Sequence, residues 1–325
     1  MLFLFSIFVL QAIIYAKKLK PTEYMVFGST DLSMSLSRLS EQENANLQAK
    51  CGSNSLNQPA NRIAGGTSAE PRQFPFAVSF ASNKRNFCGG SLISNRHVLT
   101  ALHCLFNFSK ARAGACTDPK FKTAIVVPKS VQVHYGGVCI RVEDRDKCKK
   151  VDSNTAYVKK VLFPKEFIDT GCRYGDDFAI VELDRKIQFS TYTQPVCLKN
   201  VSRAALGLIP GFKSKFSGFY DMGWGKDVED ISSARLKFIK TAIKHVHENY
   251  FFARAITIPG AQRTSICVGD SGGPLVGVEN NTNKAVLLGV HSSGDVCTDT
   301  LNGDHKNVFV PKVLDKICKW TGVCP

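Results

Sequence analysis

The chain has 325 residues, of which 44% are hydrophobic and 21% charged, a composition typical of globular proteins that argues against disorder. Its 42 lysines and arginines exceed its 27 aspartates and glutamates, which gives a formal net charge of +15. These cations are scattered and are not gathered with aromatic residues into a binding motif. Such a charge could suggest a nucleic-acid partner, but its scattered distribution argues against one and indicates a solvated cationic surface, which favours anionic substrates or cell surfaces.

The N-terminal block, residues 2–16, is uncharged and strongly apolar and is followed by Lys17 and Lys18. It is too short for a comfortable membrane span and lies where a secretory signal belongs, so residues 1–16 are expected to be a signal peptide cleaved after Ala16. No basic residue precedes the apolar core, which leaves an uncleaved anchor as the alternative. No second apolar stretch of spanning length follows, so no stable membrane insertion is expected after removal of the signal.

The next segment, residues 17–62, is polar and rich in Ser, Asn and Gln, which predicts a flexible pro-segment. Beyond Gly66, short apolar runs alternate with Gly, Asn, Asp and Pro turns, as is typical of an antiparallel all-β domain. The clearest runs are residues 76–80, 91–100, 178–183 and 285–290. Near the C-terminus, Pro311 precedes apolar residues at helical spacing, which predicts a terminal helix.

Twelve cysteines behind a signal peptide indicate an oxidising compartment and a disulfide framework. No Cys-x-x-Cys pair supports zinc. His245 and His247 could share a strand face but have no partner cluster, so no metal and no cofactor is assigned. N-glycosylation sequons begin at Asn107, Asn200 and Asn280.

The segment most informative about chemistry is residues 269–274, Gly-Asp-Ser-Gly-Gly-Pro. A serine hydroxyl is unreactive at neutral pH unless a neighbouring base takes its proton. Gly269 has no Cβ and could turn its peptide so that its N–H and that of Ser271 form an oxyanion hole. The segment therefore predicts a nucleophile at Ser271, which needs a histidine and an orienting carboxylate elsewhere in the chain.

His103 is the candidate base, because an apolar run, residues 98–102, leads directly into His103 and Cys104. A strand would deliver the histidine and the cysteine could anchor it. Asp177 stands at the mouth of another apolar strand, where partial burial and hydrogen bonding could fix the tautomer of an imidazole. Asp176 is the competing candidate.

Four motifs together closely resemble the chymotrypsin family of serine proteases: residues 100–104 (Thr-Ala-Leu-His-Cys), 177–180 (Asp-Phe-Ala-Ile), 223–225 (Gly-Trp-Gly) and 269–274. The order His, Asp, Ser is also that of the family, and counting back from Ala179 favours Asp177. The resemblance runs from about Ile63 to the C-terminus, so residues 63–325 are expected to form the protease domain. It implies an all-β fold of two six-stranded antiparallel β-barrels joined near residues 194–200, with a catalytic cleft between them and a short C-terminal helix.

The separation of His103 from Asp177 is longer than the resemblance implies, which predicts an insertion within residues 110–160. This stretch includes a charged run, residues 141–150, bounded by Cys139 and Cys148. A solvated surface loop pinned by a Cys139–Cys148 disulfide is the simpler interpretation. A loop that recognises substrate or a partner is the alternative.

The activation site is also implied by the resemblance. Arg62 followed by Ile63-Ala64-Gly65-Gly66 departs slightly from the usual Ile-Val-Gly-Gly. Cleavage after Arg62 would create an ammonium group at Ile63 that pairs with Asp270 and orders the oxyanion hole. Because leaving either buried charge alone is expensive, this pair would act as the switch.

Three disulfides are implied by the same resemblance. Cys88 with Cys104 would clamp the histidine loop, Cys267 with Cys297 would bracket the specificity pocket, and Cys51 with Cys197 would keep the pro-segment attached after cleavage. Apart from the Cys139–Cys148 hypothesis, the pairing of the remaining cysteines stays open: Cys116, Cys139, Cys148, Cys172, Cys318 and Cys324.

The resemblance also implies a specificity pocket whose floor is formed by the residue six before the nucleophile, here Ser265. A trypsin-like pocket instead needs an aspartate there to bind Arg or Lys. An uncharged, bulky apolar side chain fits better, and a trypsin-specific digestive enzyme is disfavoured. Ser292 would frame the catalytic aspartate, Ser293 stands where the family has tryptophan, and Gly294 would leave the pocket mouth open.

These residues predict a secreted serine endopeptidase made as a zymogen, with protein or peptide substrates. A protease with Ser265 would cut poorly after Arg62, so an activating protease with basic-residue specificity is an expected partner, and protein inhibitors are potential ones. The alternative is a catalytically impaired pseudoprotease that acts as a secreted binding protein, which Ser293 favours and an intact triad opposes.

Overall fold

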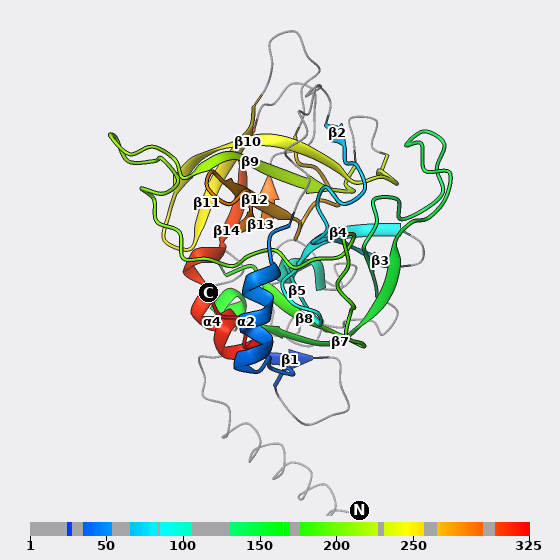
Figure 1. Cartoon of the computed structure of the whole chain (residues 1–325). Helices are drawn as coiled ribbons and strands as arrows, with labels where there is room; N and C mark the ends of the chain where they lie inside the picture. The colour runs from blue at the N-terminus through cyan, green and yellow to red at the C-terminus, as the bar shows by residue number, and fades with distance from the viewer. Residues whose placement is uncertain are drawn as a thin grey trace, which may run out of the picture.

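The computed structural model describes residues 25–27, 35–53, 66–82, 85–105, 131–164, 166–169, 176–226, 231–256, 265–294 and 303–325. Two closed six-stranded antiparallel barrels make up most of this part of the chain, and a C-terminal helix follows them (Figure 1). The predicted all-β fold is confirmed. Within the described residues, no helix is long and apolar enough to cross a membrane.

The first barrel is built from six strands in the order β7-β6-β3-β4-β5-β8 and closes where β7 pairs with β8. The strands are β3 (Ala77–Ser82), β4 (Arg85–Leu92), β5 (His97–Thr100), β6 (Gln132–Tyr135), β7 (Asn154–Phe163) and β8 (Ala179–Leu183). All of β5 and β8 is buried, so the apolar runs that flank the candidate histidine and aspartate lie in the core. Hydrophobic burial at these strands thus holds both segments in place.

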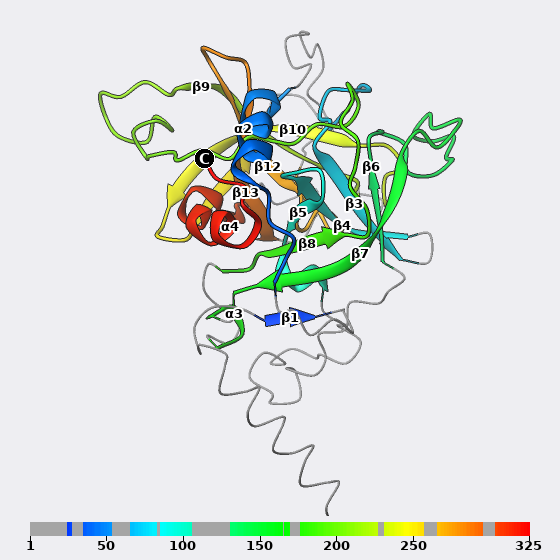
Figure 2. The ribbon, with the colours of Figure 1, turned by 60° about the horizontal axis from the view of Figure 1, so that its bottom comes forward.

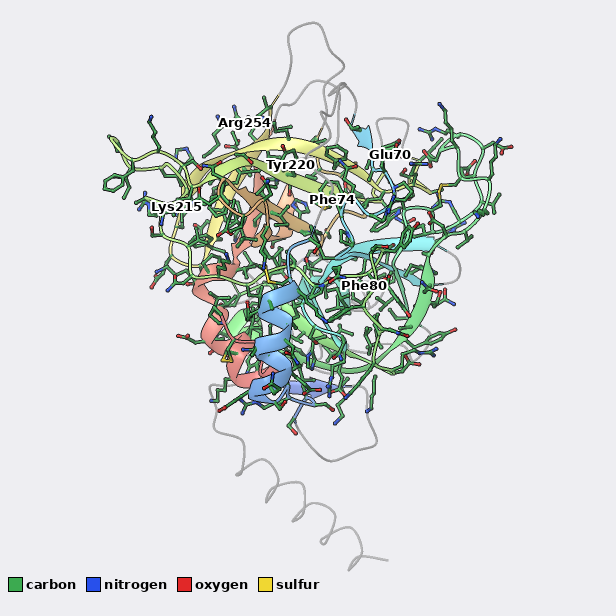
Figure 3. All side chains as sticks on the ribbon, viewed as in Figure 1. Glu70, Phe74, Phe80, Lys215, Tyr220 and Arg254 are labelled. Atoms are coloured by element: carbon green, nitrogen blue, oxygen red, sulfur yellow. A yellow bond between two sulfur atoms is a disulfide. The ribbon has the colours of Figure 1, made fainter. Side chains whose placement is uncertain are left out.

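The second barrel has the order β11-β14-β13-β12-β9-β10 and closes where β10 pairs with β11. Its strands are β9 (Phe216–Gly223), β10 (Lys237–Val246), β11 (Tyr250–Ala255), β12 (Pro274–Glu279), β13 (Ala285–Gly294) and β14 (His305–Phe309). A further strand, β2 (Thr67–Ser68), pairs with β10 outside the closed ring. Phe74, which is labelled in Figure 3, lies just before β3. Its ring packs 5.0 Å from that of Phe238 on β10 and so links the two barrels.

The pro-segment was expected to be flexible, and for residues 35–53 this prediction is wrong. Helix α2 (Glu41–Lys50) begins at Ser40, whose side chain and that of Glu43 form a reciprocal capping box. Leu36, Leu39 and Leu47 are buried in the main hydrophobic core. Upstream, strand β1 (Met25–Phe27) pairs with β7 at the edge of the first barrel.

The N-terminal segment 35–53 lies beside the C-terminal helix α4 (Leu314–Thr321), as both ribbon views show (Figure 2). Leu39 N–H donates to the carbonyl of Thr321 at 2.7 Å, and the Asn44 and Gln48 side chains donate to the carbonyl of Cys324. The Cys51–Cys197 disulfide joins the segment to the connection between the barrels. These contacts explain why a polar segment is folded here: its few leucines are covered by the protease domain.

Two short helical turns, η1 (Leu102–Leu105) and η5 (Val310–Lys312), and one short helix, α3 (Glu166–Asp169), complete the elements. The loop between β6 and β7 contains the Cys139–Cys148 disulfide and packs on the second barrel. There the Trp224 indole donates to the carbonyl of Val138 at 2.9 Å, and Ala234 N–H donates to Asp146. The rest of the predicted insertion, before residue 131, lies outside the described residues.

Candidate active site

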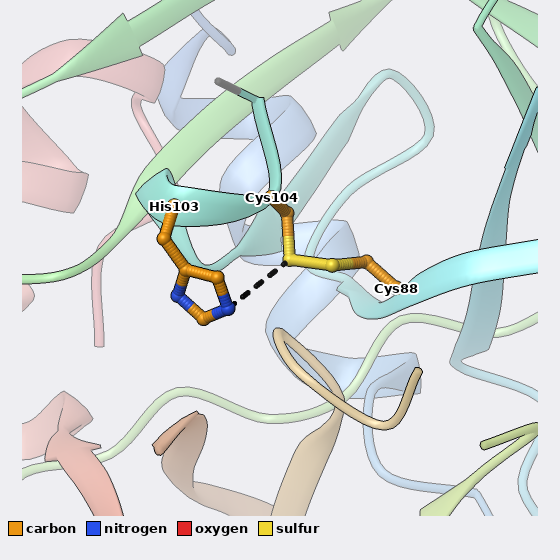
Figure 4. Close-up of side chains that lie close together, drawn as sticks. All are labelled: Cys88, His103 and Cys104. Atoms are coloured by element: carbon orange, nitrogen blue, oxygen red, sulfur yellow. Dashed lines mark hydrogen bonds between the residues drawn. A yellow bond between two sulfur atoms is a disulfide. The ribbon is translucent and has the colours of Figure 1, made fainter. Parts of the chain in front are cut away.

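His103 is held in the turn η1, directly after strand β5. Cys104 forms a disulfide with Cys88 on β4, which ties this turn to the neighbouring strand, and the His103 Nε2 atom lies 3.9 Å from the Cys104 sulfur (Figure 4). Cys88, His103 and Cys104 are the one group with metal-ligand spacing within the described residues. Because both sulfurs are in the disulfide, they are not thiolates and cannot bind a metal ion as such.

Asp177 contacts His103 twice. Its Oδ2 atom lies 2.7 Å from His103 Nδ1, and its Oδ1 atom accepts the backbone N–H of His103 at 2.9 Å. The Ser292 hydroxyl donates to the same Oδ2 atom at 2.6 Å. Asp176 instead lies near Lys316 of helix α4, with 4.0 Å between Oδ1 and Nζ. The structure therefore brings Asp177, and not Asp176, to the histidine.

The pair is electrostatically coupled. Burial lowers the pKa of His103, but the charge of Asp177 and its hydrogen bond outweigh this effect and leave the pKa above its ordinary value. Burial raises the pKa of Asp177, whereas the His103 charge and the hydrogen bonds from His103 and Ser292 leave it lowered. The arrangement favours an ionised carboxylate that stabilises an imidazolium.

Ser271 lies on a loop pressed against the strand end that leads to His103. Gly89 N–H donates to the carbonyl of Ser271 at 2.7 Å. A Cβ atom at Gly272, whose φ is +78°, would lie 2.6 Å from the Gly89 carbonyl oxygen and 2.9 Å from the Ala101 nitrogen. Only glycine allows this close approach of the serine loop to residues 89–101.

Gly269 also has a positive φ, +99°. In the part of the chain that the structure describes, the N–H groups of Gly269 and Ser271 donate no hydrogen bond, whereas those of Asp270, Gly272 and Gly273 donate to backbone carbonyls. The two amide groups on either side of Asp270 thus have no acceptor among the described residues.

Asp270 is buried, and its carboxylate accepts the N–H groups of Gly225 at 2.7 Å and Cys267 at 2.9 Å. Burial and, to a smaller extent, nearby Asp221 raise its pKa to about 6, against the opposing effect of these two hydrogen bonds. Among the described residues, none forms an ion pair with it. Arg62 and Ile63 lie outside the described residues.

The predicted substrate-binding residues occupy two segments. Ser292, Ser293 and Gly294 end strand β13 and become progressively exposed, and Ser265 is exposed just before Ile266 and Cys267. Cys267 is disulfide-bonded, and its expected partner, Cys297, lies outside the described residues. The structure therefore describes the part of the predicted pocket wall that β13 forms.

The structure contains the Cys51–Cys197 and Cys88–Cys104 bonds that the resemblance implied, and also Cys139–Cys148 and Cys318–Cys324. The last pair had no sequence signal beyond the number of cysteines. Cys116 and Cys172 lie outside the described residues. Of the sequons, Asn200 and Asn280 are exposed and Asn107 is not described.

Sequence reasoning missed two features beside the site. Arg141, in the loop between β6 and β7, donates to the Asn86 side chain at 3.0 Å and to the carbonyl of Ser232, so this loop spans from one barrel to the other. In the second barrel, His291 of β13 and His305 of β14 are buried beside each other, and His305 contacts Asp221 of β9. A single sequence does not reveal these contacts, because they form only when the loop packs across the two barrels and the strands of the second barrel come together.

Two closed antiparallel barrels with an aspartate–histidine pair and a serine loop at their junction define the class of the chain, a serine endopeptidase. The family model described as Trypsin matches residues 63–313, so the chain belongs to the trypsin family. It is 26% identical to coagulation factor IX of Cavia porcellus over 247 residues, which cover 73% of this chain and 74% of that protein. It is 28% identical to transmembrane protease serine 9 of Rattus norvegicus over 78% of this chain and 21% of that protein. Phenoloxidase-activating factor 1 of Holotrichia diomphalia is 26% identical over 73% of this chain and 64% of that protein.

Proposed function

We propose that the chain is a secreted zymogen that, after cleavage following Arg62, hydrolyses peptide bonds with Ser271 as nucleophile. His103 takes the hydroxyl proton as general base and then gives it to the leaving amine. The N–H groups of Gly269 and Ser271 hold the oxyanion, and water hydrolyses the acyl-enzyme. In the chymotrypsin template, neutralising the aspartate lowers turnover about 10⁴-fold, and one oxyanion donor in subtilisin contributes roughly 10²- to 10³-fold.

The observation that carries this proposal is the double contact of Asp177 with His103. The carboxylate accepts both the backbone N–H and the Nδ1 proton of the histidine, and Ser292 donates to it. Such an arrangement fixes the imidazole in the tautomer whose Nε2 can act as a base. Signal cleavage after Ala16, glycosylation at the sequons and the pairing of Ile63 with Asp270 are parts of the same proposal.

The test is covalent labelling by a fluorophosphonate. Protein treated with trypsin, and sequenced to show a new N-terminus at Ile63, should label. Ser271→Ala should abolish labelling without lowering the unfolding temperature, and Ser265→Ala is the matched control that should still label. Labelling that survives Ser271→Ala refutes the assignment.

For specificity, Ser265 at the predicted pocket floor supplies no carboxylate, so we propose cleavage after uncharged or bulky apolar residues and not after Arg or Lys. The same feature makes self-activation after Arg62 inefficient and implies a separate activating protease. Incubation of the purified zymogen alone tests this: rapid self-cleavage after Arg62 would refute it.

The second candidate is a pseudoprotease that binds a partner. Ser293 favours it, because the tryptophan that supports extended substrate in the family is replaced by a small residue. Absence of labelling after cleavage at Arg62, with the fold intact, would select this function over the first.

A further inference from the structure

A group of polar side chains lies buried in the second barrel, behind the end of strand β13. Asp221, His291, His305 and Asn307 are exposed by 1%, 5%, 2% and 0%. They come from three strands, β9, β13 and β14. A barrel interior is usually apolar, because burying a polar group costs free energy unless it is hydrogen-bonded.

Two of these residues, Asp221 and His305, form a hydrogen bond with each other. His305 Nε2 lies 2.9 Å from Asp221 Oδ2. The ring of His291 packs edge-on against that of His305, with 5.4 Å between centroids. His291 is also the register partner of Asn307 in the β13–β14 pairing, so their side chains point to the same face.

The other two retain unmet hydrogen-bonding capacity. Among the described residues, His291 Nδ1 and Asn307 Oδ1 are buried without a hydrogen-bond partner. Unpaired buried polar atoms are uncommon in folded proteins, and each one is destabilising. An imidazole nitrogen and a carboxamide oxygen on one face of a sheet together suit a group that can both donate and accept.

The position of His291 connects this group with substrate. His291 directly precedes Ser292, whose hydroxyl binds Asp177. Its carbonyl accepts the N–H of Gly272 at 2.7 Å, and its own N–H donates to Gly273 at 3.0 Å. It therefore lies between the serine loop and the strand end that forms the proposed pocket wall.

We propose that His291 and Asn307 determine specificity by binding the side chain that precedes the scissile bond, and that they select a carboxamide, glutamine or asparagine. This inference rests on the proposed function. It narrows the preferred substrate side chain from uncharged residues in general to uncharged residues that form hydrogen bonds. An apolar side chain would leave both polar atoms buried and unpaired, a defect that a site built for hydrogen bonding rejects strongly.

Charged side chains fit less well. Burial, His305 and His103 lower the pKa of His291 well below its ordinary value, so at neutral pH it offers no positive charge to a carboxylate. A substrate carboxylate beside it would therefore be buried without a counter-charge, which costs free energy. A basic side chain would lack a negative charge to pair with, because Asp221 is already paired with His305 and Ser265 has no carboxylate.

The experiment uses the full chain, activated by trypsin and titrated with a fluorophosphonate to count active sites. Peptides that differ only before the scissile bond carry Gln, Asn, Leu, Glu or Arg. The expected kcat/KM per labelled site for Gln or Asn exceeds that for Leu by about tenfold or more, the loss expected for one unmet buried hydrogen bond. Absence of labelling refutes the proposed function, whereas labelled enzyme that prefers Leu, Glu or Arg overturns this inference alone.

Variants separate recognition from folding. His291→Val should reduce the preference for carboxamide over Leu about tenfold per labelled site, and His291→Gln, which keeps a polar group, should retain part of it. His245→Val is the matched control, because His245 is an exposed histidine of the same barrel. If His291→Val does not fold, Asn307→Ser takes its place with the same expected loss. An unchanged preference in a folded variant overturns the proposal.

Discussion

Asp270 provides the sharpest test of the proposed activation switch. In the uncleaved chain its carboxylate is buried and held by two backbone N–H groups, and burial raises its pKa from 3.8 to about 6. The folded state therefore binds this proton more tightly than the unfolded state. The associated stability is fully present below pH 3.8 and is lost as the pH rises through 6. A shift of about two pH units corresponds to about 3 kcal/mol.

The assay is equilibrium unfolding of the uncleaved Ser271→Ala protein between pH 4 and pH 8, with and without Asp270→Asn. Asparagine loses one hydrogen bond, because the two N–H groups bind different carboxylate oxygens and the amide nitrogen that replaces one of these oxygens cannot accept. Its stability should nevertheless lack the fall through pH 6. The difference in unfolding free energy between the two proteins should thus shift by about 3 kcal/mol over this range, in favour of asparagine at high pH. Exposed Asp315→Asn is the control.

Cleavage after Arg62 should then remove the fall in stability that the uncleaved protein shows as the pH rises through 6. If the Ile63 ammonium pairs with Asp270, the cleaved protein no longer contains an uncompensated buried anion, and its stability should not fall through pH 6. With Asp270→Asn in the Ser271→Ala background, cleavage should leave the shape of the pH profile unchanged. With Asp270→Asn alone, which keeps Ser271, the cleaved protein should not be labelled at Ser271. Parallel pH profiles for the uncleaved aspartate and asparagine proteins would refute the reasoning.

Three further results are expected. Leu47→Ala should destabilise the protein by about 2–5 kcal/mol, because it opens a cavity in the main core. The control Gln42→Ala, at an exposed position of the same helix, should change stability by less than about 0.5 kcal/mol. Equal losses of the two variants in chemical denaturation would contradict this. With Cys51 and Cys197 both replaced by serine, the N-terminal fragment should still co-elute with the cleaved domain in gel filtration, and its release would show that the disulfide alone retains it. Burial holds the pKa of His97 at about 4, so about 3 kcal/mol of stability should be lost as the pH falls from 6.5 to 4, and His97→Gln should lose less over that range in pH-dependent unfolding.

Strands and the terminal helix were predictable from the sequence where an apolar run or a proline determines the local structure. The run at residues 178–183 became β8, and Pro311 precedes the predicted terminal helix. The run at residues 91–100 was only partly predicted, because it contains the end of β4, a turn and then β5. In that turn the hydroxyl of Ser94 accepts the N–H groups of Arg96 and His97, a local contact that apolar content does not reveal.

Helix α2 shows what the sequence signal lacked. Ser40 and Glu43 have the spacing of a capping box, which was available as a signal, but Leu47 is the one buried residue within the helix. An apolar stripe this sparse does not give helical periodicity, since most of the helix's stability comes from the domain on which it packs. His291 and Asn307 were missed for a related reason: their pairing depends on the register of β13 and β14, which only the closed barrel defines.

The N-terminal segment and the proposed activation switch together imply that cleavage after Arg62 would exchange one source of stability for another. In the uncleaved chain, the Cys51–Cys197 bond closes a loop with a sequence separation of 146, and the loss of loop entropy in the unfolded state stabilises the fold by about 5 kcal/mol. That stabilisation exceeds the roughly 3 kcal/mol that burying the Asp270 carboxylate costs at neutral pH. A cut after Arg62 opens this loop, so the disulfide then joins two chains and no longer restricts the unfolded one in the same way. The same cut creates the ammonium that can compensate Asp270. The stability gained on cleavage arises at Asp270, beside the serine loop, where the ammonium compensates the buried carboxylate. The stability lost arises in the unfolded state, which the disulfide no longer restricts. Cleavage can therefore order the active site with little change in overall stability.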